Sequence, residues 1–416
     1  MGAVTDRLDS LLKFHPFTRL NALLEGVTPG GPTLAFSVGE PQAAPPDFLA
    51  EILERHKAEW SRYPQSAGTP DFRRAVRDWL QRRYRLAEGF LDPDQDIMPC
   101  AGTREALFHL ALAAVPEWQG KGPRPAVLMP SPFYHVYAGA AAVAGAEPIF
   151  LPATPANGFL PEPELVDAAT LARTALAYVC SPSNPQGAVA SRDYLARWVS
   201  LARKHNFAIA FDECYAEIYR GQPPAGALEV AEGSLDNLIV LHSLSKRSAA
   251  PGLRSGFIAG DRRLIRRVTQ LVNFGGSAPS FPALAASAAL WREESHVEAG
   301  RERYRRSFAI AERLLGNRFG FVAPAGGFFL WLDVGDGEAA AKRLWAEAGL
   351  RVLPGAYMAR PDAEGRNPGA PYIRVALVHE PEVVEEGLTR LVRVLTPPES
   401  DSRPESDSRD DMAAAL

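Results

Sequence analysis

Side chains capable of covalent and acid–base chemistry follow three short apolar runs in the middle of the chain. Lys246 and Arg254 lie eight residues apart in SLSKRSAAPGLRSG, directly after LIVLH. Asp212 and Tyr215 lie in DECY after FAIAF, and Asn184 lies in SPSNPQG after ALAYVC. A site for pyridoxal phosphate needs a lysine amine, an acid partner for the pyridine nitrogen and a phosphate anchor. These residues therefore predict that Lys246 joins that cofactor covalently.

A phosphate anchor is predicted from three parts of the sequence. Gly102, Thr103 and Arg104 follow DIMPC and open an amphipathic helix, whose first backbone N–H groups attract an anion. Arg254 is suited to a bidentate contact with phosphate. Two short hydroxyl donors, Ser243 and Ser245, complete this anchor. Tyr134, which follows AVLMP, supplies an aromatic side chain to the same crevice and is not part of the anchor. Each of these residues alone has an ordinary structural role, so the prediction rests on their combination.

The elements that must position these residues are short buried strands. Between residue 97 and residue 260, apolar runs of four to seven residues alternate with amphipathic stretches: AVLMP, PIFLP, ALAYVC, FAIAFDE, LIVLHS and GFIAG. Such runs are typical of parallel strands buried on both faces, with helices between them, and predict an α/β fold. Ligands bind beyond the carboxyl ends of such strands, so we expect the candidate residues to meet in one crevice.

The flanking segments have a different pattern. Helices are predicted over Asp9–Gly26 and Asp47–Trp60, and a further one begins with Thr69 as N-cap and Pro70 in its first turn. A long charged helix, Trp291–Leu315, precedes FVAPAGGFFLWLDV, GLRVLPGAYM and YIRVALV, which predict a small antiparallel or mixed sheet. A last helix is expected from Pro381 to Leu395.

These patterns divide the chain into four parts. Residues 1–45 are expected to join a smaller domain, 46–290 to form the large cofactor-binding domain, 291–396 to form the smaller α+β domain, and 397–416 to be a disordered tail.

Composition limits the classes of partner. The 416 residues carry a formal charge of −4, and the last twenty alone hold six acids and two arginines, so the rest is neutral. A neutral body argues against nucleic acid or a membrane surface as partner. Three scattered cysteines without a C-x-x-C pair indicate a reducing, cytoplasmic setting and no zinc site. No run is long enough to span a bilayer, and the N-terminus lacks the apolar region of a signal peptide.

The ordered set Asn184-Pro185, Asp212-x-x-Tyr215, Lys246, Arg254 and a late Arg374 resembles the class I and II pyridoxal-phosphate aminotransferases of the aspartate aminotransferase fold. The resemblance covers about residues 10 to 396. It implies a fold-type-I transferase: a mostly parallel seven-stranded sheet between helices in the large domain, plus the smaller α+β domain, in a homodimer.

The resemblance also implies a role for each site residue. Lys246 would hold the cofactor and move the substrate proton, and Asp212 would face the pyridine nitrogen. The ring hydroxyl would be bound by Tyr215 and Asn184, and the ring face by Tyr134. The substrate carboxylate would be bound by Arg374, with Asn184 and a backbone N–H at Gly39. Tyr63 would reach the phosphate of the neighbouring subunit.

Several longer sequence segments, among them YPQSAGTPDFR, DECYAEIY and HSLSKRSAAPGLRSGFIAGD, resemble those of the N-succinyldiaminopimelate aminotransferases of bacterial lysine synthesis. Two departures are Gln186, where a threonine is usual, and Ser255, where an aliphatic residue is usual. The resemblance implies N-succinyl-LL-2,6-diaminopimelate as amino donor and 2-oxoglutarate as acceptor. Arg19, Arg104 and Lys13 are unranked candidates for binding the far end of that donor.

Other functions are less well supported. The sequence has neither the G-x-G-x-x-G of a dehydrogenase nor the phosphate loop of a nucleotide hydrolase. An aminotransferase for aspartate, aromatic amino acids or alanine remains an alternative, as do a pyridoxal-phosphate lyase and an aminotransferase-like DNA-binding regulator. We expect packing or polar roles for three histidines near the site loops, His109, His135 and His242. The cysteines Cys100, Cys180 and Cys214 are expected to be buried free thiols.

Overall fold

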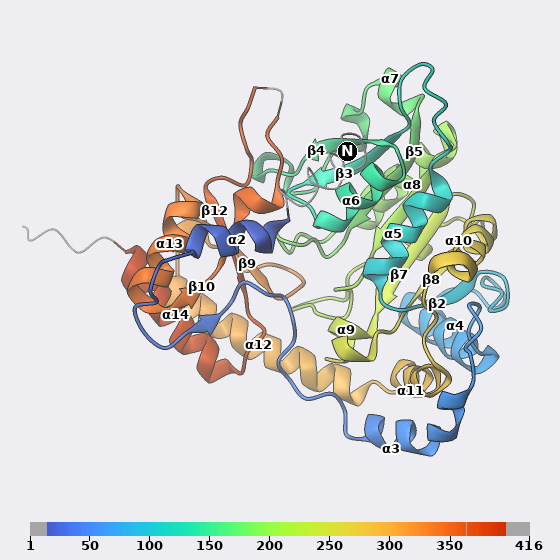
Figure 1. The fold of residues 1–416 in the computed structure, drawn as a ribbon, viewed down its shortest axis with the longest axis horizontal. Helices are drawn as coiled ribbons and strands as arrows, with labels where there is room; N and C mark the ends of the chain where they lie inside the picture. Colours follow the sequence, from blue (N-terminus) through green and yellow to red (C-terminus); the bar gives the residue numbers. More distant parts are fainter. Residues whose placement is uncertain (1–14, 363, 397–416) are drawn as a thin grey trace, which may run out of the picture.

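The computed structural model describes residues 15–362 and 364–396. A large sheet with helices on both faces forms one side of the molecule, and a small sheet with the C-terminal helices forms the other (Figure 1). The predicted tail and the start of the first predicted helix lie outside the described residues.

Seven strands form the large sheet, in the order β2-β8-β7-β6-β5-β3-β4. Their bounds are β2 Ile97–Cys100, β3 Ala126–Ser131, β4 Glu147–Pro152, β5 Thr174–Cys180, β6 Ala208–Asp212, β7 Leu238–Ser243 and β8 Gly256–Gly260. Strands β3 to β7 are parallel, which confirms the mostly parallel seven-stranded sheet. Strand β2 is antiparallel to β8, so its carboxyl end lies at the same edge as theirs.

The prediction that GFIAG is one more parallel strand was wrong. Strand β8 runs antiparallel to both of its neighbours. Only residues 244–255 connect β7 to β8, and they hold one turn of helix, α9 (Leu244–Arg247), and a 3-10 turn, η5 (Pro251–Leu253). A parallel return needs a crossover that spans the sheet, usually through a helix, and this connection is too short for one. The turn between the two strands instead carries Lys246.

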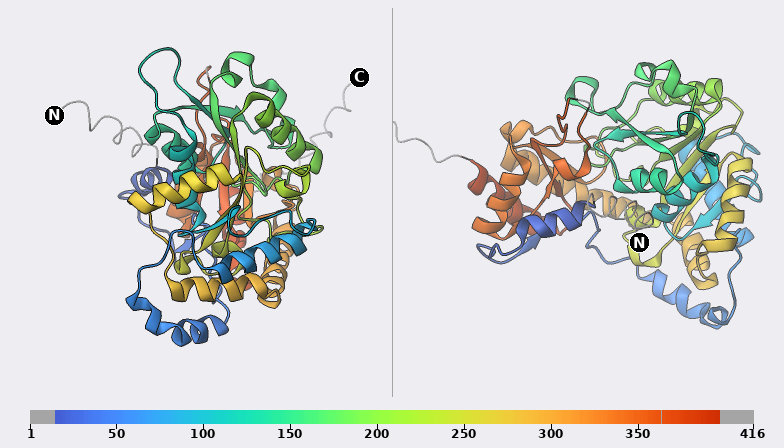
Figure 2. Two further views of the ribbon diagram at one scale, coloured as in Figure 1. Left: turned by 90° about the vertical axis from the view of Figure 1, so that its right-hand side faces the viewer. Right: turned by 45° about the horizontal axis from the view of Figure 1, so that its top comes forward.

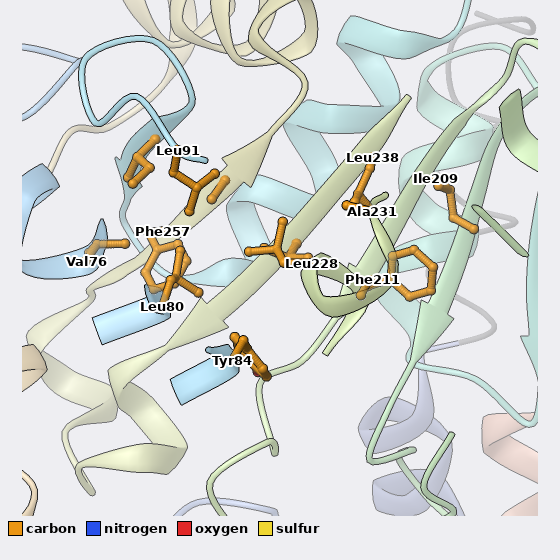
Figure 3. Close-up of a cluster of buried hydrophobic side chains, with 14 of the residues drawn as sticks. Val76, Leu80, Tyr84, Leu91, Ile209, Phe211, Leu228, Ala231, Leu238 and Phe257 are labelled. Carbon is orange, nitrogen blue, oxygen red and sulfur yellow. The ribbon is translucent and has the colours of Figure 1, made fainter. Parts of the chain in front are cut away.

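Both faces of the large sheet are buried, as its continuous apolar strands require. In β6, Ile209 and Phe211 face one layer of the core, whereas Ala208 and Ala210 face the other. Figure 3 shows Val76 and Leu80 of helix α4 beside Phe257 of β8 in the first layer.

Thirteen α-helices fall within the described residues, labelled α2 to α14. Around the large sheet they are α3 Phe48–Arg55, α4 Pro70–Tyr84, α5 Thr103–Ala114, α6 His135–Val143, α7 Ala168–Leu171, α8 Arg192–His205, α9, α10 Arg262–Gly275 and α11 Phe281–Arg292. The others are α2 Pro16–Leu24, α12 Ser295–Leu315, α13 Gly337–Ala348 and α14 Pro381–Leu395. In this part of the chain, none is long and apolar enough to cross a membrane.

Helix boundaries follow local capping where the sequence signal was strong. Thr69 accepts the N–H of Phe72 at 3.2 Å, which confirms it as the N-cap of α4. The predicted helix Asp47–Trp60 instead ends at Arg55 and continues as a 3-10 turn, η1 (Lys57–Ser61). The predicted helix Trp291–Leu315 is broken, because the Glu293 carboxylate accepts the N–H of Ser295 at 2.6 Å and starts α12 afresh.

The small sheet is antiparallel, in the order β11-β12-β9, with bounds Leu353–Pro354, Tyr372–Ala376 and Phe329–Asp333. The N-terminal segment packs beside it: β1 (Leu34–Ala35) pairs with β10 (Leu350–Arg351), and α2 contacts α13 (Figure 2). The division into four parts at residues 45, 290 and 396 remains a prediction.

Candidate active site

Lys246 lies in the turn between β7 and β8, at the edge where the parallel strands end. Its Nζ donates a hydrogen bond to the carbonyl oxygen of Gly39 and lies 5.7 Å from the centre of the Phe328 ring. Burial lowers the pKa of Lys246 to about 8, with a smaller lowering by Arg374. The lysine can therefore lose its proton near neutral pH, as a nucleophilic amine must.

Asp212 ends β6 and is 4% exposed. One carboxylate oxygen accepts a hydrogen bond from the Tyr137 hydroxyl at 2.7 Å, and the other accepts the backbone N–H of Cys214 at 3.3 Å. Burial raises the pKa of Tyr137 well above its usual range, so the phenol keeps its proton and remains a donor. The carboxylate is thus held in one orientation by two donors.

Arg374 reaches the same edge from β12 of the small sheet. Its two terminal nitrogens donate to Asn184 Oδ1 at 2.9 Å and to the Ser37 carbonyl at 2.7 Å, and its guanidinium lies 4.2 Å from the centre of the Phe329 ring. Its Nε is buried and has no partner among the described residues. Burial lowers the pKa of Arg374 to about 10, which leaves it charged at neutral pH.

The predicted phosphate anchor is assembled from two loops. Gly102 precedes α5 with a φ of +97°, and a Cβ there would lie 2.3 Å from Nη2 of Arg254. Arg254, itself in the left-handed region at φ +55°, donates to the Ala101 carbonyl at 2.8 Å. A side chain at position 102 would therefore displace the arginine. The cradle accordingly has a backbone N–H terminus with a guanidinium directly beside it, as an anion site requires.

The other cofactor-site candidates make their own contacts. Thr103 Oγ1 lies 2.9 Å from Cys214 Sγ, which joins the start of α5 to the residues after β6. Arg104 Nε donates to the Tyr134 hydroxyl at 2.9 Å. Ser243 Oγ accepts the Ser245 N–H at 3.1 Å and caps α9. The first two contacts join the ends of β2, β3 and β6, and the third fixes the start of the lysine turn after β7.

Tyr215 and Tyr63 differ sharply in their surroundings. Tyr215 is buried against Phe328 and Phe329, and burial raises its pKa well above the usual range, so it remains a hydroxyl donor. Tyr63 is 98% exposed and has no hydrogen bond or ring contact within the described part of the chain. The structure therefore does not bring Tyr63 to this site.

Sequence reasoning missed three aromatic residues of the site. Tyr137, which bonds Asp212, stands three residues after Tyr134, and that spacing places both on one side of a helical turn. Phe328 and Phe329, which lie against Lys246 and Arg374, follow Gly326-Gly327 at the start of a strand. Their sequence pattern is that of an ordinary buried strand, so only tertiary packing could identify them.

Two of the three histidines that were expected to have packing or polar roles, His242 and His135, have partners in the structure. His242 Nε2 lies 2.9 Å from Glu213 Oε2 in a fully buried pair, and His135 packs edge-on against His15 and Tyr134. The three cysteines are free, two buried and Cys214 half-buried.

The structure also shows the surroundings of Ser255 and Gln186, the two residues that depart from the family pattern. Ser255 is fully buried and bonded to Ser287 Oγ at 2.7 Å, so its hydroxyl is satisfied. Gln186 is buried, and its Nε2 has no partner among the described residues.

Comparison with known proteins identifies the family. The model of aminotransferase class I and II matches residues 32–391. The chain belongs to this family. It is an aminotransferase, its cofactor is pyridoxal 5′-phosphate, and its substrates are an amino acid and a keto acid. The residues fit this cofactor, since a buried amine, a buried carboxylate and the cradle at Gly102 converge on one edge of the sheet.

Individual relatives carry more specific names. An LL-diaminopimelate aminotransferase of Desulforudis audaxviator is 32% identical over 348 residues, 82% of this chain and 86% of that protein. A 4-dedimethylamino-4-oxo-anhydrotetracycline transaminase of Streptomyces rimosus, OxyQ, is 32% identical over 360 residues, 85% of this chain and 92% of that protein.

Solved structures agree on the fold. An aminotransferase of Neisseria meningitidis superposes with a TM-score of 0.87 at 36% identity, covering 93% of this chain and 100% of that one. A Thermus thermophilus protein named "probable N-succinyldiaminopimelate aminotransferase" has a TM-score of 0.78 at 23% identity, covering 94% of this chain and 100% of that one. The latter likeness concerns the fold alone. The curated relatives that are named for diaminopimelate are named for the LL-diaminopimelate form, without the succinyl group that the sequence motifs predicted.

Proposed function

We propose that this aminotransferase moves the amino group of N-succinyl-LL-2,6-diaminopimelate to 2-oxoglutarate, giving N-succinyl-2-amino-6-oxopimelate and glutamate. The observation that carries the amino-acid half of the proposal is the buried Arg374, placed beside the lysine loop by Asn184 and Ser37. Its planar guanidinium suits a substrate carboxylate, and its buried Nε has no partner in the described chain.

The bound cofactor would supply an electron sink for the carbon that loses its proton. Lys246 would hold that cofactor and then move the proton at the substrate's α carbon, for which its lowered pKa is suited. Asp212, oriented by Tyr137, would face the pyridine nitrogen, and Tyr215 and Asn184 would donate to the ring hydroxyl oxygen. Gly102, Thr103, Ser243, Ser245 and Arg254 would hold the phosphate.

The choice of donor rests on sequence resemblance and on the relatives. The longer sequence segments favour the succinylated donor, and the curated relatives with diaminopimelate in their names share its carbon skeleton. A succinyl group covers the far amine and adds a carboxylate. Of the unranked cations, Arg19 is bound to Glu338 at 3.3 Å and stacked on Tyr357, and Lys13 lies outside the described residues. Arg104 keeps two terminal nitrogens without a partner in the described chain.

A panel of amino donors with 2-oxoglutarate tests the proposal. The kcat/KM for the succinylated donor should exceed that for alanine, aspartate and free LL-diaminopimelate by at least about a hundredfold. That factor corresponds to about 2.7 kcal/mol, which one or two charge-assisted hydrogen bonds can supply. A higher value for aspartate or an aromatic donor would disprove the substrate assignment and leave the aminotransferase assignment intact.

Free LL-diaminopimelate is the second candidate donor, because relatives at 30–32% identity bear that name. The same panel separates the two candidates. If the free amino acid is the better donor, the succinyl group is not recognised, and the likeness of the longer sequence segments reflects common ancestry alone.

We further propose that the active unit is a homodimer. The 98% exposed Tyr63 supports this, since a phenol with no hydrogen bond or ring contact to the described residues is available to reach the phosphate of a neighbouring subunit. The exposed Phe274 and Trp60 add apolar surface that a second copy would cover.

A further inference from the structure

The helix that carries Lys246 cannot support itself. α9 spans only Leu244–Arg247, a single turn, and one turn of helix is not stable in isolation. Ser243 caps its start, and the Ser248 N–H donates to the Leu244 carbonyl at 3.0 Å at its end. The turn is also bonded to Ser255 through the Leu244 N–H at 3.1 Å, and the residues that follow Lys246, Arg247 and Ser248, contact the rest of the molecule.

Arg247 fixes one of these contacts. Its guanidinium is buried against two indole rings that contact each other, 5.5 Å from the centre of Trp79 and 5.0 Å from that of Trp291. It donates to three oxygens at the junction between α11 and α12: Leu290 O at 2.7 Å, Glu293 O at 3.2 Å and Glu294 Oε1 at 2.7 Å. The side chain next to the lysine is thus held at this junction.

Ser248, His296 and Glu293 form the second contact. Ser248 is 2% exposed, and its Oγ lies 2.8 Å from His296 Nε2. The other ring nitrogen of His296, Nδ1, is hydrogen-bonded to Glu293 Oε2. A carboxylate at Nδ1 holds the proton there, which leaves Nε2 to accept the Ser248 hydroxyl proton. Because Glu293 also accepts two backbone N–H groups, from Ser295 and His296, the chain of contacts has a fixed end.

The same junction is fixed on its far side by ion pairs. From α12, Arg301 bonds Glu217 Oε2 at 3.1 Å, and Arg303 bonds Glu380 at 3.1 Å, just before α14. The contacts of residues 247 and 248 therefore link the lysine turn to α12, which is itself bonded to the loop after β6 and to the residue before α14. Figure 1 shows α12 running from the large-sheet side toward the C-terminal helices.

We propose that Arg247, Ser248, His296 and Glu293 form a positioning network. This network holds the Lys246 amine in its buried position against the Gly39 carbonyl. His296 is a positioning residue in this network, since it contacts the turn and not the amine. The proposal rests on the proposed function only for the role of Lys246 as cofactor anchor, and the position of the amine can be measured without cofactor.

The groups around Lys246 and His296 determine how the pKa of Lys246 would change if the turn became less well packed. Lys246 is influenced by burial first, then by Cys214, Arg374, Glu40 and Arg104. His296 is faced by Glu293 and Arg247, and by the ring of Phe48 from α3 at 6.2 Å. If the turn loosens, water reaches the amine and the dominant influence, burial, weakens. The pKa of Lys246 should then rise from about 8 toward the 10.5 of an exposed lysine.

The experiment measures the apparent pKa of Lys246 in the cofactor-free protein. Competitive acetylation with trace acetic anhydride is followed by peptide mass spectrometry across pH 6–11, with the exposed Lys342 as internal standard. Two variants remove the network, Ser248→Ala and His296→Gln, and Ser248→Thr keeps the hydroxyl. Arg292→Gln is the matched control, because it breaks an ion pair of the same junction with Asp71 and touches neither Ser248 nor His296.

We expect the apparent pKa of Lys246 to rise by at least about half a unit in Ser248→Ala and His296→Gln. It should stay at the wild-type value in Ser248→Thr and Arg292→Gln. Folded Ser248→Ala and His296→Gln proteins with an unchanged pKa would overturn the proposal. If either fails to fold, the other and the Ser248→Thr comparison decide. A failed donor panel would refute the proposed function without altering this result.

A serine, a histidine and a carboxylate in sequence also match the arrangement of a nucleophilic triad. The 2% exposure of Ser248 speaks against attack on an external substrate. Incubation with a fluorophosphonate probe separates the two roles: the positioning role predicts no adduct on Ser248, and a stoichiometric adduct there would overturn it.

Discussion

Gly39 offers a sharp test of how closely the site is packed, through the substitution Gly39→Ala. A Cβ at position 39 would lie 2.5 Å from Cζ and 2.8 Å from Cε1 of Phe329, and 3.2 Å from the Phe328 ring. The Phe329 ring is 1% exposed and lies 4.2 Å from the Arg374 guanidinium, so it cannot move aside without displacing the arginine. The backbone carbonyl that accepts the Lys246 hydrogen bond is unchanged by the substitution.

The expected loss follows from the cost of overpacking. Adding a methyl group to a well-packed interior costs about 1–3 kcal/mol. If that strain is relieved by moving Phe329 and Arg374 from their working positions, kcat/KM falls by about 5- to 150-fold, at about 1.4 kcal/mol per factor of ten. Gly31→Ala is the matched control, because its nearest non-bonded atom would lie at 3.8 Å, an ordinary contact.

Steady-state kinetics with the preferred donor measure this loss, and a double-mutant cycle identifies its cause. Phe329→Leu shortens the side chain that the new methyl group would strike. The loss in Gly39→Ala/Phe329→Leu should therefore be smaller than the sum of the two single losses. Additive losses, or a Gly39→Ala enzyme within twofold of wild type, would refute the packing argument.

Four further results are expected. Borohydride reduction of the holoenzyme should fix the cofactor on Lys246 and on no other lysine, as read by peptide mass spectrometry. Asp212→Ala should lower kcat by at least about a hundredfold, about 2.7 kcal/mol, and recovery at saturating cofactor would exclude an electronic role for this carboxylate. The lowered pKa of Lys246 means that the unfolded chain binds more protons than the folded chain between pH 8 and 10.5. The unfolding free energy of the cofactor-free protein should therefore rise with pH in that range, relative to the Lys246→Met variant. If the two proteins show the same pH dependence in denaturation curves, the amine is not buried away from water. Tyr63→Phe should weaken cofactor retention, while light scattering should show a dimer of unchanged mass. An active monomer of the wild-type protein would exclude a site shared between subunits.

Local sequence signals were sufficient to predict the structure of segments whose conformation depends mainly on their own residues. Thr69 and Pro70 predicted the start of α4, because an N-cap oxygen and a proline in the first turn act within four residues. The apolar runs predicted the strands of the large sheet, since a strand buried on both faces must be apolar throughout. Asp212, the last residue of β6, and Lys246, which follows β7, were predicted to lie at one edge of the sheet, because parallel strands end at one edge.

Features that depend on residues distant in the sequence could be identified only from the tertiary structure. The antiparallel direction of β8 follows from the short connection after β7, and the break before α12 follows from the carboxylate of Glu293. The contacts of Tyr137 with Asp212 and of Phe329 with Arg374 join segments 75 and 45 residues apart, which no local pattern encodes. The position of the lysine is decided in the same way: the turn that carries it is too short to hold itself, so residues 293–296 of another element fix it in space.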